Sequence, residues 1–107
     1  MNDLNILADF KSTLHLLKTK PNLLVFSSDF YSICYFLKGL EQGLHLGRRF
    51  SNSITFQSWL NRENGGVLKN DWVSYIFAVL SDGNDEVAKT NLFILYSRYI
   101  EDTFRDL

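Results

Sequence analysis

Apolar residues recur along this chain at helical spacing, and this period restricts its fold more than any other feature. Near the N-terminus, large apolar side chains follow one another at intervals of three, four and three residues: Leu7, Phe10, Leu14 and Leu17. That spacing places them on one stripe of an α-helix. Asn2 or Asp3 can cap its start, and Pro21 ends it because proline has no N–H to donate.

The same period predicts four further helices, over residues 29–46, 53–64, 72–80 and 85–104. We expect Ser51 or Ser53 to cap the third helix, and Asn70 and Asp71 the fourth. The expected inward-facing residues, in chain order, are Ile33, Leu37, Leu40 and Leu44; Phe56, Trp59 and Leu60; Trp72, Tyr75, Ile76 and Val79; and Phe93, Tyr96, Ile100 and Phe104. The second helix carries further apolar residues and is expected to be central.

Turn signals separate these helices. Asn64-Gly65-Gly66 is the strongest, and residues 81–84 form another. Residues 23–26 are short and apolar, and they fit either an extended piece or a lead-in to the second helix. We therefore predict an all-α fold, a single domain over residues 1–107 made of one compact bundle of about five helices.

Glycines interrupt the second helix at every fourth position: Gly39, Gly43 and Gly47. Gly47 is expected to end that helix in a left-handed conformation. Gly39 and Gly43 lie on one helix face, and each costs about 1 kcal/mol relative to alanine. Our main interpretation is that they permit close packing of another helix of this chain. The alternative is a surface through which the protein associates with itself.

The composition supports a core without covalent reinforcement. Of the 107 residues, 46% are hydrophobic and only one is a cysteine, Cys34, so no disulfide can form within the chain. Cys34 lies in an apolar run and is expected to be a buried thiol. The first residues lack a basic leader and no apolar run is long enough to span a membrane, so we expect a cytoplasmic protein that does not bind membranes.

The sequence offers little equipment for catalysis or ligand chemistry. His15 and His45 lie on different predicted helices without an acid or cysteine at ligand spacing, so we expect no metal site and no cofactor. No serine or cysteine motif for nucleophilic catalysis is present, and we expect that the protein is not an enzyme. Its only basic doublet is Arg48-Arg49 and its pI is about 6.0, which argues against direct nucleic-acid binding.

Charge is distributed unevenly along the chain. The net charge of −1 divides into about −3 over residues 82–107 and about +2 over residues 1–81. This asymmetry fits either an ordinary solvated helix face or an acidic surface that meets a basic partner. The candidate partner-binding residues are Asp82, Asp85, Glu86, Glu101 and Asp102, with Glu41, Glu63 and Asp71 as weaker candidates.

Several short motifs occur in an order that resembles a known family. They are a proline and apolar lead-in at residues 21–26, then Phe36-Leu37-Lys38-Gly39-Leu40, Phe56-Gln57-Ser58-Trp59-Leu60, Gly65-Gly66 and Asp71-Trp72. Over residues 20–80 the chain is similar to small helical immunity proteins of bacterial contact-dependent growth inhibition, a polymorphic toxin system. The shared motifs describe the scaffold, so no partner-contact residue is carried over from them.

The resemblance implies a cytoplasmic inhibitor that forms a 1:1 complex with a cognate toxin domain and neutralises it. The toxin is expected to be a nuclease such as an RNase, whose basic substrate surface an acidic inhibitor would match. The free inhibitor is expected to be a monomer. The alternative function is a helical adaptor or regulatory protein that associates with itself through the Gly39/Gly43 helix face.

Overall fold

Five helices make up the part of the chain that the computed structural model describes, residues 3–44 and 54–104. They are α1 (Asp3–Thr19), α2 (Phe30–Leu44), α4 (Phe56–Glu63), α5 (Trp72–Ser74) continued by the π-helix η2 (Tyr75–Leu80), and α6 (Asp85–Phe104). A short 3-10 helix, η1 (Pro21–Leu23), follows α1. These residues contain no strand, and the predicted all-α fold is confirmed. The predicted roles of His45, Gly47 and Arg48-Arg49 fall outside the described residues. The cap predicted at Ser51 or Ser53 is provided by Thr55 instead.

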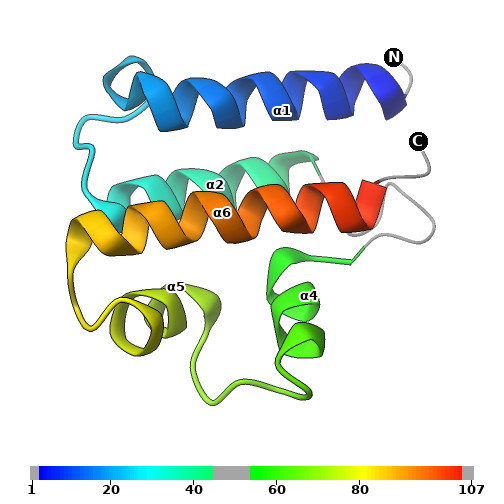
Figure 1. Ribbon diagram of the computed structural model, residues 1–107. Coiled ribbons are helices and arrows are strands. Elements are labelled where there is room, and N and C mark those ends of the chain that lie inside the picture. Colours follow the sequence, from blue (N-terminus) through cyan, green and yellow to red (C-terminus); the bar gives the residue numbers. More distant parts are fainter. Residues whose placement is uncertain (1–2, 45–53, 105–107) are drawn as a thin grey trace.

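The helices are arranged in three layers (Figure 1). The middle layer is the pair α2 and α6, which run in the same direction and contact each other. Helix α1 covers one side of this pair and runs in the opposite direction, whereas α4 and α5 cover the other side. The Cα atoms span 39 × 36 × 19 Å, so the layers form a flat molecule.

Helix α1 follows its sequence prediction closely. Its expected stripe, Leu7, Phe10, Leu14 and Leu17, is buried throughout. The helix ends at Thr19, and Pro21 then opens η1. The backbone N–H groups of Leu24 and Val25 both donate to the Pro21 carbonyl, at 2.9 and 3.0 Å. Residues 23–25 therefore close a tight turn begun by Pro21, and no part of the segment 23–26 is a strand.

The two middle helices also present the expected apolar sides. In α2, Ile33 and Leu37 are buried, together with Phe30 and the thiol of Cys34. Helix α6 has the predicted bounds, and its four expected inward residues are all buried: Phe93, Tyr96, Ile100 and Phe104. Cys34 is buried as predicted, and this burial raises the pKa of its thiol, which lowers its reactivity.

The third layer begins with a different cap from the one predicted. Oγ1 of Thr55 accepts a hydrogen bond from the Ser58 backbone N–H at 3.2 Å, so α4 starts at Phe56. The expected core residues of this helix, Phe56, Trp59 and Leu60, are all buried. Asn64 then ends α4, and Gly65 and Gly66 adopt positive φ values of 81° and 157° in the predicted turn.

The predicted stripe of the fourth helix is correct at its start and wrong at its end. Asp71 caps it as expected, and Trp72 and Ile76 are buried. Val79 was expected inside but is 60% exposed. The reason is that Tyr75–Leu80 is a π-helix, whose i→i+5 bonds add a residue to each turn and rotate later side chains off the α-helical stripe.

The expectation that Gly39 and Gly43 pack closely against another helix of this chain is wrong for the helices that the structure describes. Both glycines are exposed, and a Cβ atom built on either would find no heavy atom of the described residues within 4 Å outside its own helix backbone. Gly39 lies two positions beyond the buried Leu37, and two positions correspond to a rotation of about 200° around an α-helix. The glycines therefore lie on the side of α2 opposite the core.

The three layers meet at the ring of Tyr96 on α6. Phe10 from α1 stacks on it with a centroid distance of 5.9 Å. Phe56 from α4 lies at 4.4 Å and Trp72 from α5 at 6.4 Å, both from the opposite side of the middle layer. Aromatic pairs at these distances add about 0.5–1.5 kcal/mol each beyond their buried area. One side chain of the middle layer thus links all three.

Candidate functional site

The leading acidic candidates lie at two separate ends of α6. Asp82 lies in the turn before the helix, and Asp85 and Glu86 lie in its first turn. Glu101 and Asp102 lie in its last turn. Since an α-helix rises 1.5 Å per residue, the two groups are roughly 24 Å apart. The structure brings the first three together and does not join them with the other two.

The far group includes a carboxylate with a structural role. Oδ2 of Asp102 accepts a hydrogen bond from Nε1 of the buried Trp59, at 3.2 Å. This contact fixes α6 against α4, and Asp102 is only partly exposed. Glu101 is exposed beside it. Of the two, Glu101 is the better placed to meet a partner.

Glu41, a weaker candidate, is also a structural residue. Its Oε1 accepts from the Phe56 backbone N–H at 3.1 Å, and its Oε2 accepts from the Tyr96 hydroxyl at 3.0 Å. The carboxylate thus joins the end of α2 to the start of α4 and the middle of α6. Loss of hydration in this position raises its pKa, although both hydrogen bonds act in the opposite direction.

Asp71 and Glu63 occupy the outer layer. The Asp71 carboxylate accepts from the Ser74 backbone N–H at 3.0 Å and pairs with Nζ of Lys38 at 2.9 Å. Its pKa is lowered, first by the Ser74 N–H and also by Lys38. The Lys38 amine also lies 5.7 Å from the centroid of the Trp72 ring. Glu63 is exposed at the end of α4.

The acids at the start of α6 hold the start of α2 in place. Oδ1 of Asp85 accepts the backbone N–H of Phe30 at 2.9 Å. Nζ of Lys89 lies 2.8 Å from Glu86 and donates to the Ser28 carbonyl at 3.1 Å. The hydrogen bond to Glu86 is the main reason that the pKa of Lys89 is raised. Asp85 is half-buried in this network, whereas Asp82 and Glu86 are exposed.

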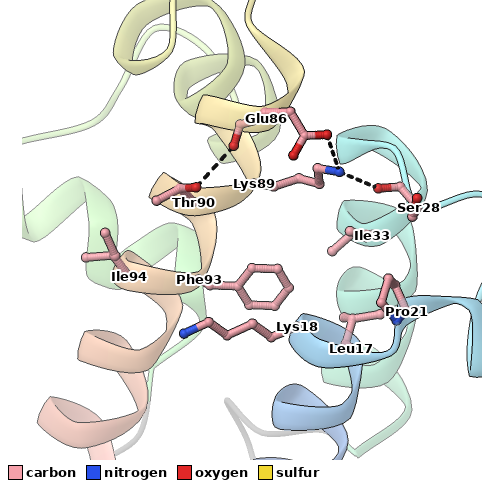
Figure 2. A pocket seen from close by; sticks show the side chains of 10 residues that line it. All are labelled: Leu17, Lys18, Pro21, Ser28, Ile33, Glu86, Lys89, Thr90, Phe93 and Ile94. Carbon is pink, nitrogen blue, oxygen red and sulfur yellow. Dashed lines mark hydrogen bonds and ion pairs between the residues drawn. The ribbon is translucent and has the colours of Figure 1, made fainter.

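A pocket of about 300 Å³ lies beside this network, between α1, η1, α2 and α6. Figure 2 shows the Phe93 ring extending into it from α6, with Leu17 and Ile33 on its far side. Lys89 lies at its rim, where the amine is already bound to Glu86 and Ser28. The pocket thus combines an apolar interior with two lysines at its edge, Lys18 and Lys89, of which Lys89 is paired within the chain.

Sequence reasoning missed a group of aromatic side chains, which we call the α2 aromatic face: the exposed Tyr31 and Tyr35 of α2 and the half-buried Phe77 of η2. The ring centroid of Tyr31 lies 5.0 Å from that of Phe77 and 6.5 Å from that of Tyr35. Tyr31 is 38% exposed and Tyr35 63% exposed. Tyr31 and Tyr35 are four residues apart and off the buried stripe of α2, and that spacing was the available signal.

Two carboxylates lie near the Tyr31 end of the α2 aromatic face. Asp85 accepts the backbone N–H of Phe30, the residue before Tyr31. Gly83, next to Asp82, donates its backbone N–H to the Phe77 carbonyl at 2.8 Å. Glu86 instead lines the pocket between α1, η1, α2 and α6. Asp82 and Asp85 are therefore the two acids that accompany this end of the face.

Residues 3–44 and 54–104 offer few side chains for binding a metal ion. No group of three or more His, Cys, Asp or Glu side chains there could hold a metal ion. His15 is exposed on α1, far in sequence from the buried Cys34. None of the described helices has the length and apolar character needed to cross a membrane.

Comparison of the chain with protein-family models, with curated proteins and with solved structures found no match.

Proposed function

We propose that this chain is an immunity protein, a cytoplasmic inhibitor that binds a cognate toxin domain of a contact-dependent growth inhibition system in a 1:1 complex. The observation that carries the proposal is the group Asp82, Asp85 and Glu86 at the start of α6, of which Asp82 and Glu86 are exposed. The order of scaffold motifs over residues 20–80 supports it independently. The proposed activity is binding, without a catalytic step.

The proposed mechanism is occlusion with electrostatic steering. A nuclease toxin such as an RNase must present a basic surface to the phosphates of its substrate. Exposed carboxylates on a rigid helix start would attract that surface over a distance and favour encounters in the right orientation. The inhibitor would then cover the substrate surface of the toxin.

Co-expression tests the function directly. The tagged protein would be produced together with the product of the adjacent upstream reading frame, and the complex captured and weighed by native mass spectrometry. We expect a stable 1:1 complex and rescue of growth from the toxicity of that product. A toxic neighbour that is neither bound nor neutralised would refute the proposal.

Paired charge neutralisation tests the role of the α6 start. We expect Asp82→Asn/Glu86→Gln to slow association with the toxin domain at low salt by roughly tenfold, because steering carries much of the encounter rate. Asparagine suits position 82, where φ is 50°. The matched control, Glu63→Gln/Glu101→Gln, removes the same charge elsewhere and should change the rate less than about twofold. Equal rates in the two variants would exclude this acidic site.

A second candidate function is self-association through the Gly39/Gly43 face of α2. It is favoured by the open space above both glycines, which no part of the described chain uses. Light scattering after size-exclusion chromatography would then give a dimer or larger species, and Gly39→Leu/Gly43→Leu would give a folded monomer. A wild-type protein that stays monomeric at high concentration would rule this function out.

A further inference from the structure

The α2 aromatic face exposes rings that the core does not use. Tyr35 is 63% exposed, and its nearest ring neighbour is Tyr31. Tyr31 is 38% exposed and its ring contacts that of Phe77. The Phe77 ring in turn stacks on the buried Phe30 with a centroid distance of 5.6 Å. The outer rings are thus held in position by an inner ring that belongs to the core. A rigid, exposed pair of tyrosines is the kind of anchor that dominates protein interfaces.

The charges beside these rings indicate what can cover them. Asp82 and Asp85 lie at the Tyr31 end: Asp82 precedes Gly83, which lies beside the Phe77 ring, and Asp85 accepts the backbone N–H of Phe30. The amine of Lys89 is bound to Glu86 and to the Ser28 carbonyl. Near the Tyr35 end, Lys38 is paired with Asp71. The surroundings are therefore acidic at one end and balanced at the other. A neutral apolar partner would leave these carboxylates beside an interface without counter-charges, whereas a basic partner would neutralise them.

We propose that the α2 aromatic face is the docking surface for an arginine-bearing segment of the partner protein, with guanidinium groups lying against Tyr31 and Tyr35 and reaching the carboxylates of Asp82 and Asp85. This inference rests on the proposed function and names the surface and the chemistry of the partner. Arginine suits it better than lysine because its planar guanidinium both stacks on aromatic rings and pairs with two carboxylate oxygens. The Glu101 end of α6, beside which the described residues present no such pair of exposed rings, takes no part.

A peptide probe tests the surface without the toxin. Hexa-arginine would be titrated into the ¹⁵N-labelled protein and the amide shifts mapped, with hexa-lysine as the control of equal charge. We expect the largest shifts around Tyr31, Tyr35 and Phe77, and binding of hexa-arginine at least about threefold tighter than that of hexa-lysine. Shifts centred on Glu101, or equal binding of the two peptides, would overturn the inference.

The most discriminating variant removes a single exposed ring. Tyr35→Ala should weaken binding of hexa-arginine and of the toxin domain by about tenfold or more, as expected for an aromatic anchor. Ile94→Ala is the matched control, because Ile94 is 54% exposed on α6 and nine positions, about 180° around the helix, from Asp85. The control should bind like the wild type. Circular dichroism would show that both variants stay folded.

The two proposals fail in different ways. If the neighbouring gene product does not bind the wild type, but hexa-arginine maps to the α2 aromatic face and needs Tyr35, the immunity function is wrong and the docking surface stands. If that product binds the wild type and Tyr35→Ala equally well, the function stands and the docking surface is wrong.

Discussion

Glu41 is the residue whose role differs most between the sequence and the structure. It was a candidate for partner binding, and the structure shows it accepting the Phe56 N–H and the Tyr96 hydroxyl within the protein. We expect Glu41→Ala to lower the free energy of unfolding by about 1–3 kcal/mol, because both donors lose their acceptor. Urea unfolding would measure this change, and a loss below about 0.5 kcal/mol would contradict the assignment.

Because the pKa of Glu41 is raised, its contribution to the free energy of unfolding depends on pH. A carboxyl whose pKa is higher in the folded state than its ordinary 4.5 adds stability below that value and loses it as the pH rises through the folded-state pKa. Glu41→Gln keeps an acceptor for Phe56 and cannot ionise. We therefore expect its stability relative to the wild type to improve between pH 4 and pH 7 in urea unfolding. A relative decline over that range would show that the sign is wrong.

Asp71 makes both a helix cap and an ion pair, and two substitutions can separate their contributions to stability. Its carboxylate caps α5 through Ser74 and pairs with the partly exposed Lys38. Asp71→Asn keeps the cap and removes only the ion pair, so we expect a change within about 0.5 kcal/mol. Asp71→Ala removes both and should lower the free energy of unfolding by about 1 kcal/mol. Thermal unfolding of the two variants would compare them, and equal losses would mean that the ion pair dominates.

At the scale of helices, the exposed glycines of α2 are positions where a substitution should raise the free energy of unfolding. Because a Cβ atom at Gly39 or Gly43 meets nothing within 4 Å in the described part of the chain, alanine gains helix propensity without a clash. We expect each Gly→Ala change to raise the free energy of unfolding by up to about 1 kcal/mol. Urea unfolding of the monomer would measure it. Destabilisation by the double variant would instead mean that the glycines are packed, as the sequence had suggested.

The starts of the helices show what local sequence could not predict. The first N–H of α2 is accepted by Asp85, that of α4 by Glu41 and that of α5 by Oε1 of Gln57, at 2.9, 3.1 and 2.6 Å. These partners lie between 15 and 55 residues away along the chain. A capping motif describes neighbours within one turn, so it identified Asp71 correctly and missed these acceptors. The π-helix that exposes Val79 also had no signal in an α-helical period.

At the scale of the whole molecule, periodicity predicted which residues are inside but not how the layers meet. The stripes of α1 and α6 were read correctly, because each helix has one long apolar side. The same periodicity could not show that the open side of α2 carries Tyr31, Tyr35 and the glycines, since exposure depends on where other helices lie. The acidic candidates were found as a set, and only the helix length showed that Glu101 lies far from Glu86.

The shared contacts of Tyr96 predict that the three layers unfold together. Phe10 and Phe56 contact it from opposite layers, while Trp59 and Trp72 report on the α4 and α5 layer. We expect tryptophan fluorescence and far-ultraviolet circular dichroism to give the same urea midpoint, as for a two-state domain. Phe10→Ala should lower both midpoints together and cost about 3–5 kcal/mol, although Phe10 lies in the α1 layer. A circular dichroism midpoint that falls while the fluorescence midpoint stays would show that α1 unfolds separately from the other two layers.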